Sequence, residues 1–311
     1  MTAEAATAVA TPARQRCLEL AVALRPYQWP KNGLVFAALA FSAGSAWEFG
    51  DAQSWWPLLW RTAVTFAAWC IAASAVYLVN DTFDRHADQL HPLKRNRPIA
   101  RGVVSPRTAV SAATVLAVAA VAIAVAVDWL SGAVLAGYVL GMVAYSAGLK
   151  AIALVDVLAL TGGVIARAVS GAAAIDVEIS PWLYVCTGFA AFFVATSKRW
   201  AEFRELGEGA ARHRAALDSY TSELLTQMLA VSACAALLSY ALYSIESENA
   251  PASGAMALTI PFVGFAMFRY LQLLSGERRG DAPDRILFTD PAILVAVAGF
   301  VAVALAVLAS Q

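Results

Sequence analysis

The sequence predicts an all-α integral membrane protein, a single domain over residues 1–311 folded as a polytopic bundle of about nine transmembrane helices. Hydrophobic residues make up 60% of the chain and charged residues only 14%, whereas a soluble chain has about 45–50% apolar and about 25% charged residues. The apolar residues also gather in long segments, and about 20 apolar residues are needed to cross a bilayer as a helix. A soluble globule, a disordered chain and a disulfide-stapled secreted fold are therefore excluded.

Nine segments are candidates for these helices, although the first is short for a span. Between them lie shorter polar connections, some basic and some acidic. We expect the spans at residues 33–48, 58–80, 107–127, 129–147, 152–175, 180–197, 224–245, 255–274 and 291–310.

The basic residues lie on one side of these segments. Cytoplasmic loops are enriched in Lys and Arg, and twenty of the 22 basic residues precede the first segment or fall in alternate connections after it. The other two, Arg61 and Arg167, lie inside apolar segments. Residues 1–13 lack the basic start of a secretory signal. We therefore expect a multi-pass protein of the cell (inner) membrane whose amino end is cytoplasmic.

Residues 1–31 form a cytoplasmic, interfacial segment ahead of the first span. Its mixture of basic and apolar residues suits a helix in the plane of the membrane interface, and Tyr27 and Trp29 suit headgroup depth. A topology anchor without chemistry would explain most of this stretch equally well. Lys31 stands apart because it marks the cytoplasmic mouth of the first span.

An acidic motif follows the second segment. Asn80, Asp81, Asp84 and Asp88 form N-D-x-x-D-x-x-x-D, and helical offsets of three, four and seven place Tyr77 and the aspartates along one face. Converging carboxylates repel one another unless a cation lies among them, and Mg²⁺ takes one or two carboxylates together with waters and substrate phosphates. We predict a Mg²⁺-diphosphate site with the three aspartates as catalytic residues and Asn80, Asp81 and Asp84 as metal ligands.

Basic residues follow the aspartates directly, at Lys94, Arg95, Arg97 and Arg101. They are placed to contact phosphate oxygens that a metal leaves free, and arginine can do so bidentately. The alternative is an ordinary cytoplasmic loop. We expect residues 81–106 to form a cytoplasmic active-site loop. Because 22 basic residues balance 22 acidic ones in the whole chain, the charge offers no case for nucleic-acid binding.

At these motifs the chain resembles the UbiA superfamily of intramembrane prenyltransferases. The aspartate motif at Asn80–Asp88 and R-P-I-A-R-G at Arg97–Gly102 match the superfamily pattern as they stand. One departure is the second D-x-x-x-D of ordinary prenyltransferases, since Asp156 has Ile152 and Leu160 at those offsets. The resemblance implies a UbiA-like helical bundle, and the departure puts a second metal in doubt.

Within the superfamily the chain is most similar to its phosphoribosyltransferase branch. Four stretches carry this likeness, at Arg25–Asn32, at His91–Lys94, at Tyr145–Lys150 with Asp156, and at Lys198–Glu202 followed by Ser219–Thr221. The branch implies Mg²⁺-dependent transfer of 5-phosphoribosyl from 5-phosphoribosyl 1-diphosphate to decaprenyl (polyprenyl) phosphate. The product would be the β-linked lipid-phosphoryl-ribose 5-phosphate used for cell-wall arabinan precursors, with diphosphate released.

The nucleophile would be a phosphate that is already anionic, so no general base is required. With these substrates, we expect two further groups of residues to take part. Donor binding falls to Lys31, Tyr77, Lys94, Arg97, Arg101, Lys150, Asp156 and Lys198, and the lipid phosphate or polar cavity to Tyr145, Arg167 and Arg199.

Two features are compatible with a purely structural role as well as with a functional one. Residues 198–223 are a long polar insertion that we expect to be a second cytoplasmic active-site loop and a lid, although Lys198 and Glu202 would also form an ordinary helix pair. Arg167 lies inside the fifth segment, where an unpaired charge costs at least about 2.5–3.5 kcal/mol. It should face protein or water, and helix carbonyls could satisfy it.

Two other functions stay open. Prenyl transfer from a prenyl diphosphate to an aromatic or lipid acceptor keeps the aspartate site, and the missing second aspartate counts against it. A transporter or channel would place its binding groups near the bilayer midplane, whereas the charged cluster here lies at the ends of spans. Faces rich in Ala and Gly allow close helix packing and leave room for a homo-oligomer.

Overall fold

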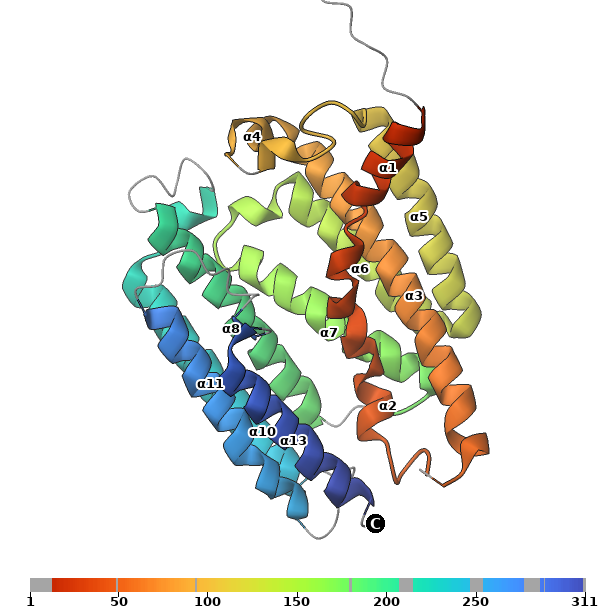
Figure 1. Cartoon of the computed structure of the whole chain (residues 1–311), viewed down its shortest axis with the longest axis vertical. Coiled ribbons are helices and arrows are strands. Elements are labelled where there is room, and N and C mark those ends of the chain that lie inside the picture. Colours follow the sequence, from red (N-terminus) through yellow and green to blue (C-terminus); the bar gives the residue numbers. More distant parts are fainter. Residues whose placement is uncertain are drawn as a thin grey trace, which may run out of the picture.

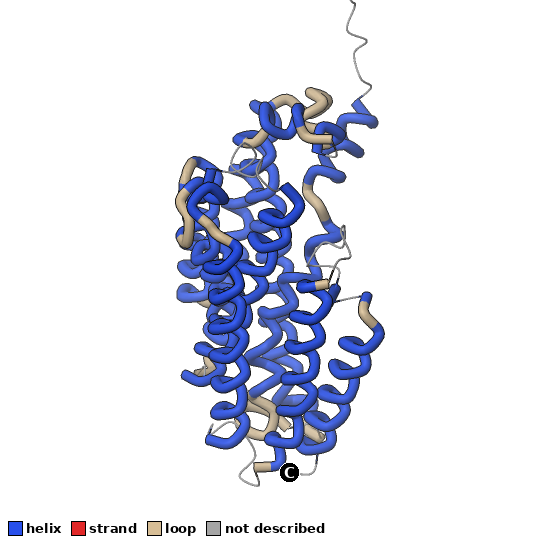
Figure 2. Tube along the Cα trace, turned by 90° about the vertical axis from the view of Figure 1, so that its left-hand side faces the viewer, coloured by secondary structure: helices blue, strands red, loops and turns tan. Residues whose placement is uncertain are grey.

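The computed structural model describes residues 13–48, 50–92, 94–178, 181–206, 215–246, 254–276, 286–287 and 289–309. Within these ranges the chain forms helices joined by turns and no β-strand (Figure 2). The predicted all-α class is therefore confirmed. Short 3-10 helices, labelled η, lie between some of the α-helices.

The elements run in chain order as an antiparallel succession of helices (Figure 1). They are α1 (Ala13–Ala23), η1 (Pro26–Phe36), α2 (Ala37–Phe41), α3 (Ala52–Phe83), α4 (Arg85–Leu90), η2 (Lys94–Asn96), α5 (Pro106–Val127), α6 (Trp129–Ala147), η3 (Leu149–Ala151), α7 (Val155–Ile175), α8 (Pro181–Leu206), η5 (Ala215–Ser219), α10 (Ser222–Glu246), η6 (Ala255–Thr259), α11 (Ile260–Ser275) and α13 (Pro291–Ala309).

Six helices among the described residues are long and apolar enough to cross a membrane: α3, α5, α6, α7, α10 and η6 continued by α11. The protein is thus a multi-pass membrane protein. The other three predicted spans coincide with η1 and α2, with α8, and with α13, whose apolar part Pro291–Val307 is shorter. The count of about nine spans stays a prediction.

The first predicted span, residues 33–48, differs most from its expected form. The chain there continues the 3-10 helix η1, adds the five-residue α2 and then turns, instead of forming one α-helix. Pro30 lies inside η1, and proline cannot donate the backbone hydrogen bond that an α-helix interior needs. This segment is therefore irregular where it lies against α3 and α7.

Most helices pack against the helix that follows them in the chain, and α3 also packs against later helices. α3 lies against α5, α6 and α7, α7 against α8, α8 against α10, and α11 against α13. α3 has 32 residues and is about 48 Å long, which exceeds the roughly 30 Å hydrocarbon core. Its last turns therefore extend past the hydrocarbon and lead into α4, at the end of the bundle that we call the α4 end (top of Figure 1).

Small residues let η1 approach α7 closely. A Cβ atom on Gly171 would lie 2.0 Å from the carbonyl oxygen of Val35, so only glycine fits at this contact. Around it, alanines of α3 and α5 pack against the fully buried Trp69 and Leu135. In a bilayer such close packing, and not hydrophobic exclusion of water, holds helices together. The contact places the polar residues of η1 against the middle of α7.

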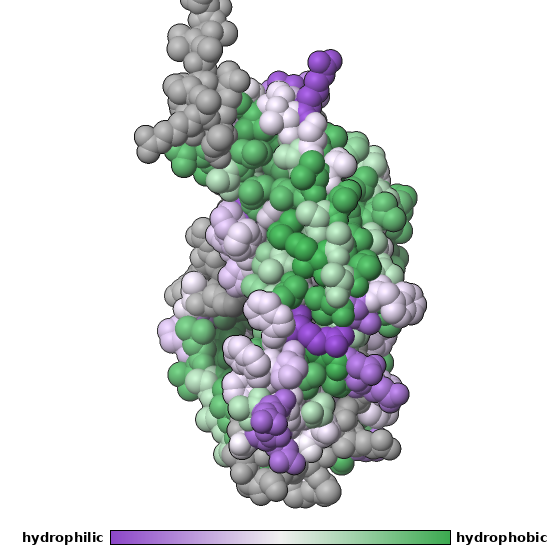
Figure 3. All heavy atoms as spheres, turned by 90° about the vertical axis from the view of Figure 1, so that its right-hand side faces the viewer, coloured by the Kyte–Doolittle hydropathy of each residue, from purple (hydrophilic) through white to green (hydrophobic). Residues whose placement is uncertain are grey.

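Apolar side chains cover the outer faces of the helices. On α5, Val115 and Val118 are 68% and 65% exposed, and the space-filling view of this side of the molecule shows a broad apolar area (Figure 3). Such an area would be unfavourable in water. It is suited to contact with lipid tails.

Candidate active site

The acidic motif lies at the α4 end, where α3 passes into α4. Asp84 is both the C-cap residue of α3 and the N-cap residue of α4. Its backbone N–H donates to the carbonyl oxygen of Asn80 at 2.9 Å, and the N–H of Asp88 donates to that of Asp84 at 2.8 Å. Because the helical hydrogen-bond pattern continues through the junction, Asp81, Asp84 and Asp88 stay near one face.

Asp81 and Asp88 share one arginine. Nη1 of Arg97 lies 3.1 Å from Oδ1 of Asp81 and 2.7 Å from Oδ2 of Asp88. Asp81 also accepts from Nη2 of Arg25 at 2.5 Å, and the guanidinium carbon of Arg25 lies 4.7 Å from the centre of the Tyr77 ring. Both carboxylates are buried. Burial raises the pKa of Asp88 above its usual value, and the charge of Arg97 opposes this rise.

Asp84 is held from the opposite side, by the connection between α6 and α7. Lys150 of η3 forms an ion pair with Oδ1 of Asp84, and Nδ2 of Asn80 donates to Oδ2 at 3.0 Å. Ser146, near the end of α6, donates to Oδ1 of Asn80 at 3.3 Å. The structure therefore joins the predicted Asn80, Asp84 and Lys150 into one polar cluster although the lysine lies 66 residues further along the chain.

A second buried network lies at the start of α7. Asp156 is fully buried; its Oδ2 lies 2.7 Å from Nε of Arg199, and its Oδ1 accepts from the Tyr220 hydroxyl at 2.7 Å. That hydroxyl accepts in turn from the backbone N–H of Leu154 at 2.7 Å, and Arg199 pairs with Glu202 as well. Burial raises the pKa of Tyr220 to about 12, so its hydroxyl keeps its proton and donates a hydrogen bond to the carboxylate of Asp156.

This network changes the interpretation of residues 198–223. Arg199 and Tyr220 tie both ends of that insertion to α7 through Asp156, and Tyr145 of α6 is buried. Residues 207–214, the middle of the predicted lid, lie outside the described residues. Asp156 thus contacts protein groups of the insertion in this structure, where the sequence predicted a contact with donor.

Arg167 lies deep inside the bundle. It stands about 18 Å along α7 from the first residue of that helix, and its Nε donates to Oδ1 of the buried Asn32 at 2.8 Å. Nη1 donates to the carbonyl oxygen of Gly163 at 2.5 Å, and Nη2 to the Tyr138 hydroxyl at 3.3 Å. Its guanidinium carbon is 5.0 Å from the ring centres of both Trp69 and Tyr138.

The remaining predicted residues are more peripheral. Lys31 and Lys94 are exposed, and Lys198 is half-buried on α8. Arg101 forms an ion pair with Glu19 of α1 at 2.6 Å. Arg97 and Lys150 therefore pair with the aspartates, whereas Arg101 pairs with the amino-terminal helix α1.

Several residues of these clusters were absent from the predicted site, and four of them come from the motifs quoted above: Arg25, Asn32, Ser146 and Tyr220. Each lies within one of the stretches that carry the family likeness, which was the available signal. Arg25 adopts a left-handed conformation with φ of 53°, a costly conformation for a residue with a side chain. It brings its guanidinium back onto Asp81.

The donor set suits a metal that also binds substrate. Within the described ranges, His, Cys, Asp and Glu side chains form no group of three placed to hold a metal ion; Arg25, Arg97 and Lys150 pair with the aspartates instead. Asn80 and Asp84 nevertheless lie side by side and offer an amide and a carboxylate oxygen. Mg²⁺ commonly takes only one or two protein carboxylates and fills its shell with waters and substrate phosphates, so these residues fit it.

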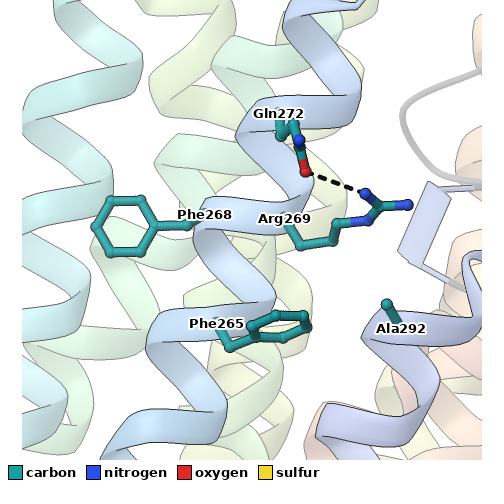
Figure 4. Close-up of a pocket in the computed structure, with 5 residues that line it drawn as sticks. All are labelled: Phe265, Phe268, Arg269, Gln272 and Ala292. Carbon is teal, nitrogen blue, oxygen red and sulfur yellow. Dashed lines mark hydrogen bonds between the residues drawn. The ribbon is translucent and has the colours of Figure 1, made fainter.

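A separate pocket of about 360 Å³ lies between α11 and α13. Figure 4 shows the Arg269 side chain extending from α11 toward α13, above Phe265 and Ala292, with a hydrogen bond to Gln272 of the same helix. The guanidinium of Arg269 is already paired with Asp290 at 2.9 Å, and that pairing lowers the pKa of Asp290. None of the predicted site residues lines this pocket.

The comparisons with known proteins agree with the fold. Residues 34–289 match the UbiA prenyltransferase family. The chain therefore belongs to the UbiA prenyltransferase family, as its motifs predicted.

Curated relatives specify the likeness further. The chain is 36% identical to decaprenyl-phosphate phosphoribosyltransferase of Mycolicibacterium smegmatis over 299 residues, which cover 92% of this chain and 91% of the relative. It is 34% identical to the protein of the same name from Mycobacterium tuberculosis, with 92% and 93% covered. The corresponding protein of Corynebacterium glutamicum is 33% identical, with 88% and 81% covered.

Solved structures share the fold. A UbiA homolog from Archaeoglobus fulgidus bound to GPP and Mg²⁺ matches 94% of this chain and 99% of its own with a TM-score of 0.70 at 18% identity. A structure described for digeranylgeranylglyceryl phosphate synthase in membranes matches 93% and 99% with a TM-score of 0.67 at 12% identity. The helical bundle is thus that of UbiA proteins.

Proposed function

We propose that this protein transfers 5-phosphoribosyl from 5-phosphoribosyl 1-diphosphate to decaprenyl phosphate or a similar polyprenyl phosphate, and releases diphosphate. The observation that carries the proposal is the 33–36% identity, along about nine-tenths of the chain, to proteins named decaprenyl-phosphate phosphoribosyltransferase. The cluster of carboxylates and cations at the α4 end supplies groups suited to a diphosphate leaving group. The product would serve cell-wall arabinan synthesis.

The orientation follows from the charge pattern. We place the α4 end and the amino terminus on the cytoplasmic face of the cell membrane, because the basic residues of the chain gather on that side. A water-soluble donor then reaches the aspartates from the cytosol. The lipid acceptor reaches them from the bilayer.

Mg²⁺, when bound by Asn80, Asp81 and Asp84, would neutralise charge on the diphosphate. Arg25, Arg97 and Lys150 now pair with the carboxylates at that site. At these positions the three cations would also be within the site to bind phosphate oxygens of the diphosphate, Arg97 in a bidentate manner. They would stabilise the negative charge that grows on the leaving group.

The reaction needs no proton transfer. An oxygen of the acceptor phosphate bonds to the anomeric carbon, and the bond from that carbon to the diphosphate breaks, with its electron pair leaving on the diphosphate. Attack opposite the leaving group inverts the carbon, so an α-linked donor gives a β-linked product. The absence of a histidine base from the described cluster is compatible with this chemistry.

The proposal is tested with purified protein in lipid nanodiscs, given Mg²⁺, decaprenyl phosphate and 5-phosphoribosyl 1-diphosphate labelled in the ribose. We expect label in the organic phase, loss of that signal with EDTA and its return with excess Mg²⁺. An Asp84→Asn variant of equal folded content is the matched control. Failure of folded wild-type protein to label the lipid would refute phosphoribosyl transfer and favour prenyl transfer from a prenyl diphosphate.

A further inference from the structure

Two arginines lie inside the apolar helices, and their surroundings differ. Arg61 of α3 donates to the carbonyl oxygens of Ala174, at 2.6 Å, and Val127, at 3.0 Å. These are the last turns of α7 and α5, where carbonyl groups have no partner within the helix and the dipole favours a cation. Arg61 therefore has a sufficient structural role. Arg167 lies in the middle of α7, where no helix ends.

The partners of Arg167 are neutral. Within the part of the chain that the structure describes, its hydrogen-bond acceptors are the Asn32 amide, the Gly163 carbonyl and the Tyr138 hydroxyl, and no carboxylate forms an ion pair with it. A guanidinium has five N–H donors, so three such bonds leave two unused. A charged side chain at this depth is costly and is normally paired or faces a polar cavity, and no carboxylate among the described residues pairs with Arg167.

The position of Arg167 connects it to the aspartate site. Arg167 bonds to Asn32 of η1, the helix that begins directly after Arg25, and Arg25 is the residue that pairs with Asp81. Arg167 is also only partly buried. A ligand held at the aspartates would therefore have this cation beneath it, within the membrane.

We propose that Arg167 binds a phosphate monoester of a substrate, which supplies the missing counter-charge. Guanidinium suits this ligand because its planar fork binds phosphate bidentately. The proposal rests on the proposed function, which offers two such groups: the phosphate of the polyprenyl acceptor and the 5-phosphate of the donor. The aromatic rings of Trp69 and Tyr138 hold the guanidinium in place for either one.

The most informative variant is Asn32→Asp, which leaves Arg167 intact and gives it an internal carboxylate. Oδ1 of residue 32 already accepts from Nε of Arg167, so the new charge falls on an existing contact. If Arg167 binds phosphate, Asn32→Asp should raise KM for one substrate about tenfold or more while kcat changes less. If Arg167 is only structural, the added ion pair should leave both KM values unchanged, and that result would overturn the proposal.

Arg167→Gln and Arg167→Lys complete the series, with Arg61→Gln as the matched control for loss of an intramembrane arginine. We expect Arg167→Gln to raise the same KM, Arg167→Lys to recover part of the loss, and Arg61→Gln to lower the thermal unfolding midpoint without altering either KM. The substrate whose KM moves identifies the source of the phosphate, lipid or donor. Equal effects of Arg61→Gln and Arg167→Gln on KM would contradict the assignment.

Direct binding separates this proposal from the proposed function. Native mass spectrometry of wild-type and Asn32→Asp protein with decaprenyl phosphate, and in a second arm with ribose 5-phosphate, requires no turnover. Weaker retention of one of them by Asn32→Asp supports Arg167 as its binding residue even if no phosphoribosyl transfer is found. Equal retention of both by the two proteins would refute it while leaving phosphoribosyl transfer intact.

Discussion

Replacement of Arg97 by glutamine should destabilise the protein because it removes the cation shared by two buried carboxylates. Removing one partner of a buried ion pair costs about 3–5 kcal/mol. Two features of the structure reduce this figure: the Arg97 side chain is 25% exposed, and Asp81 keeps its contact with Arg25. Asp88 bears most of the loss. We therefore expect Arg97→Gln to lower the free energy of unfolding by about 2 kcal/mol.

The pH dependence of this deficit follows from the pKa of Asp88. Burial already raises that pKa, and loss of Arg97 raises it further, so the folded variant binds a proton more tightly than the unfolded chain does. The ionised carboxylate then destabilises the variant at neutral pH. As pH falls through the folded-state pKa of Asp88, the carboxyl group protonates and the deficit should shrink.

The assay is denaturant unfolding in detergent micelles followed by circular dichroism at neutral and acidic pH. The double variant Arg97→Gln/Asp88→Asn is the decisive control, because a neutral amide at residue 88 needs no cation. It should recover most of the stability lost by Arg97→Gln at neutral pH. If the double variant is no more stable than Arg97→Gln, the buried charge of Asp88 is not the cause and the reasoning is refuted.

Three further substitutions test the rest of the site. Asp84→Asn should lower kcat by about 10²-fold or more with an unchanged unfolding midpoint, as measured by lipid labelling and circular dichroism; wild-type turnover would remove Asp84 from the metal site. Lys150→Met should raise the KM for the diphosphate donor about tenfold, and unchanged steady-state kinetics would exclude that contact. Tyr220→Phe should lower the free energy of unfolding by about 1–3 kcal/mol, since it removes hydrogen bonds at Asp156. Tyr27→Phe, at a residue 70% exposed, is its control in the same unfolding assay and should change stability by less than about 0.5 kcal/mol.

Much of the bundle could be predicted because apolar length and helix periodicity are local properties of the sequence. The helices α3, α5, α6, α7 and α10 lie within a few residues of their predicted segments. The aspartate face could be predicted for the same reason, since the helical pattern continues through Asp84.

Contacts between distant parts of the chain could not be predicted in this way. By sequence, Arg25 suits a topology signal. Its left-handed backbone conformation instead directs its side chain to Asp81. Arg101 belongs to the phosphate-binding pattern by sequence, but α1 packs beside it and offers Glu19. Asp156 suits a cavity by sequence, and the return of the chain at Tyr220 buries it. Each outcome depends on packing that periodicity does not encode.

The most direct test of the account is a competition between donors. Purified protein in nanodiscs would receive Mg²⁺, decaprenyl phosphate, an aromatic acceptor, and equal amounts of 5-phosphoribosyl 1-diphosphate and geranyl diphosphate. Mass spectrometry and NMR would then identify the lipid product and its anomeric configuration. The account predicts decaprenyl phosphate carrying ribose 5-phosphate in β-linkage. A prenylated aromatic product with no ribosylated lipid would contradict it.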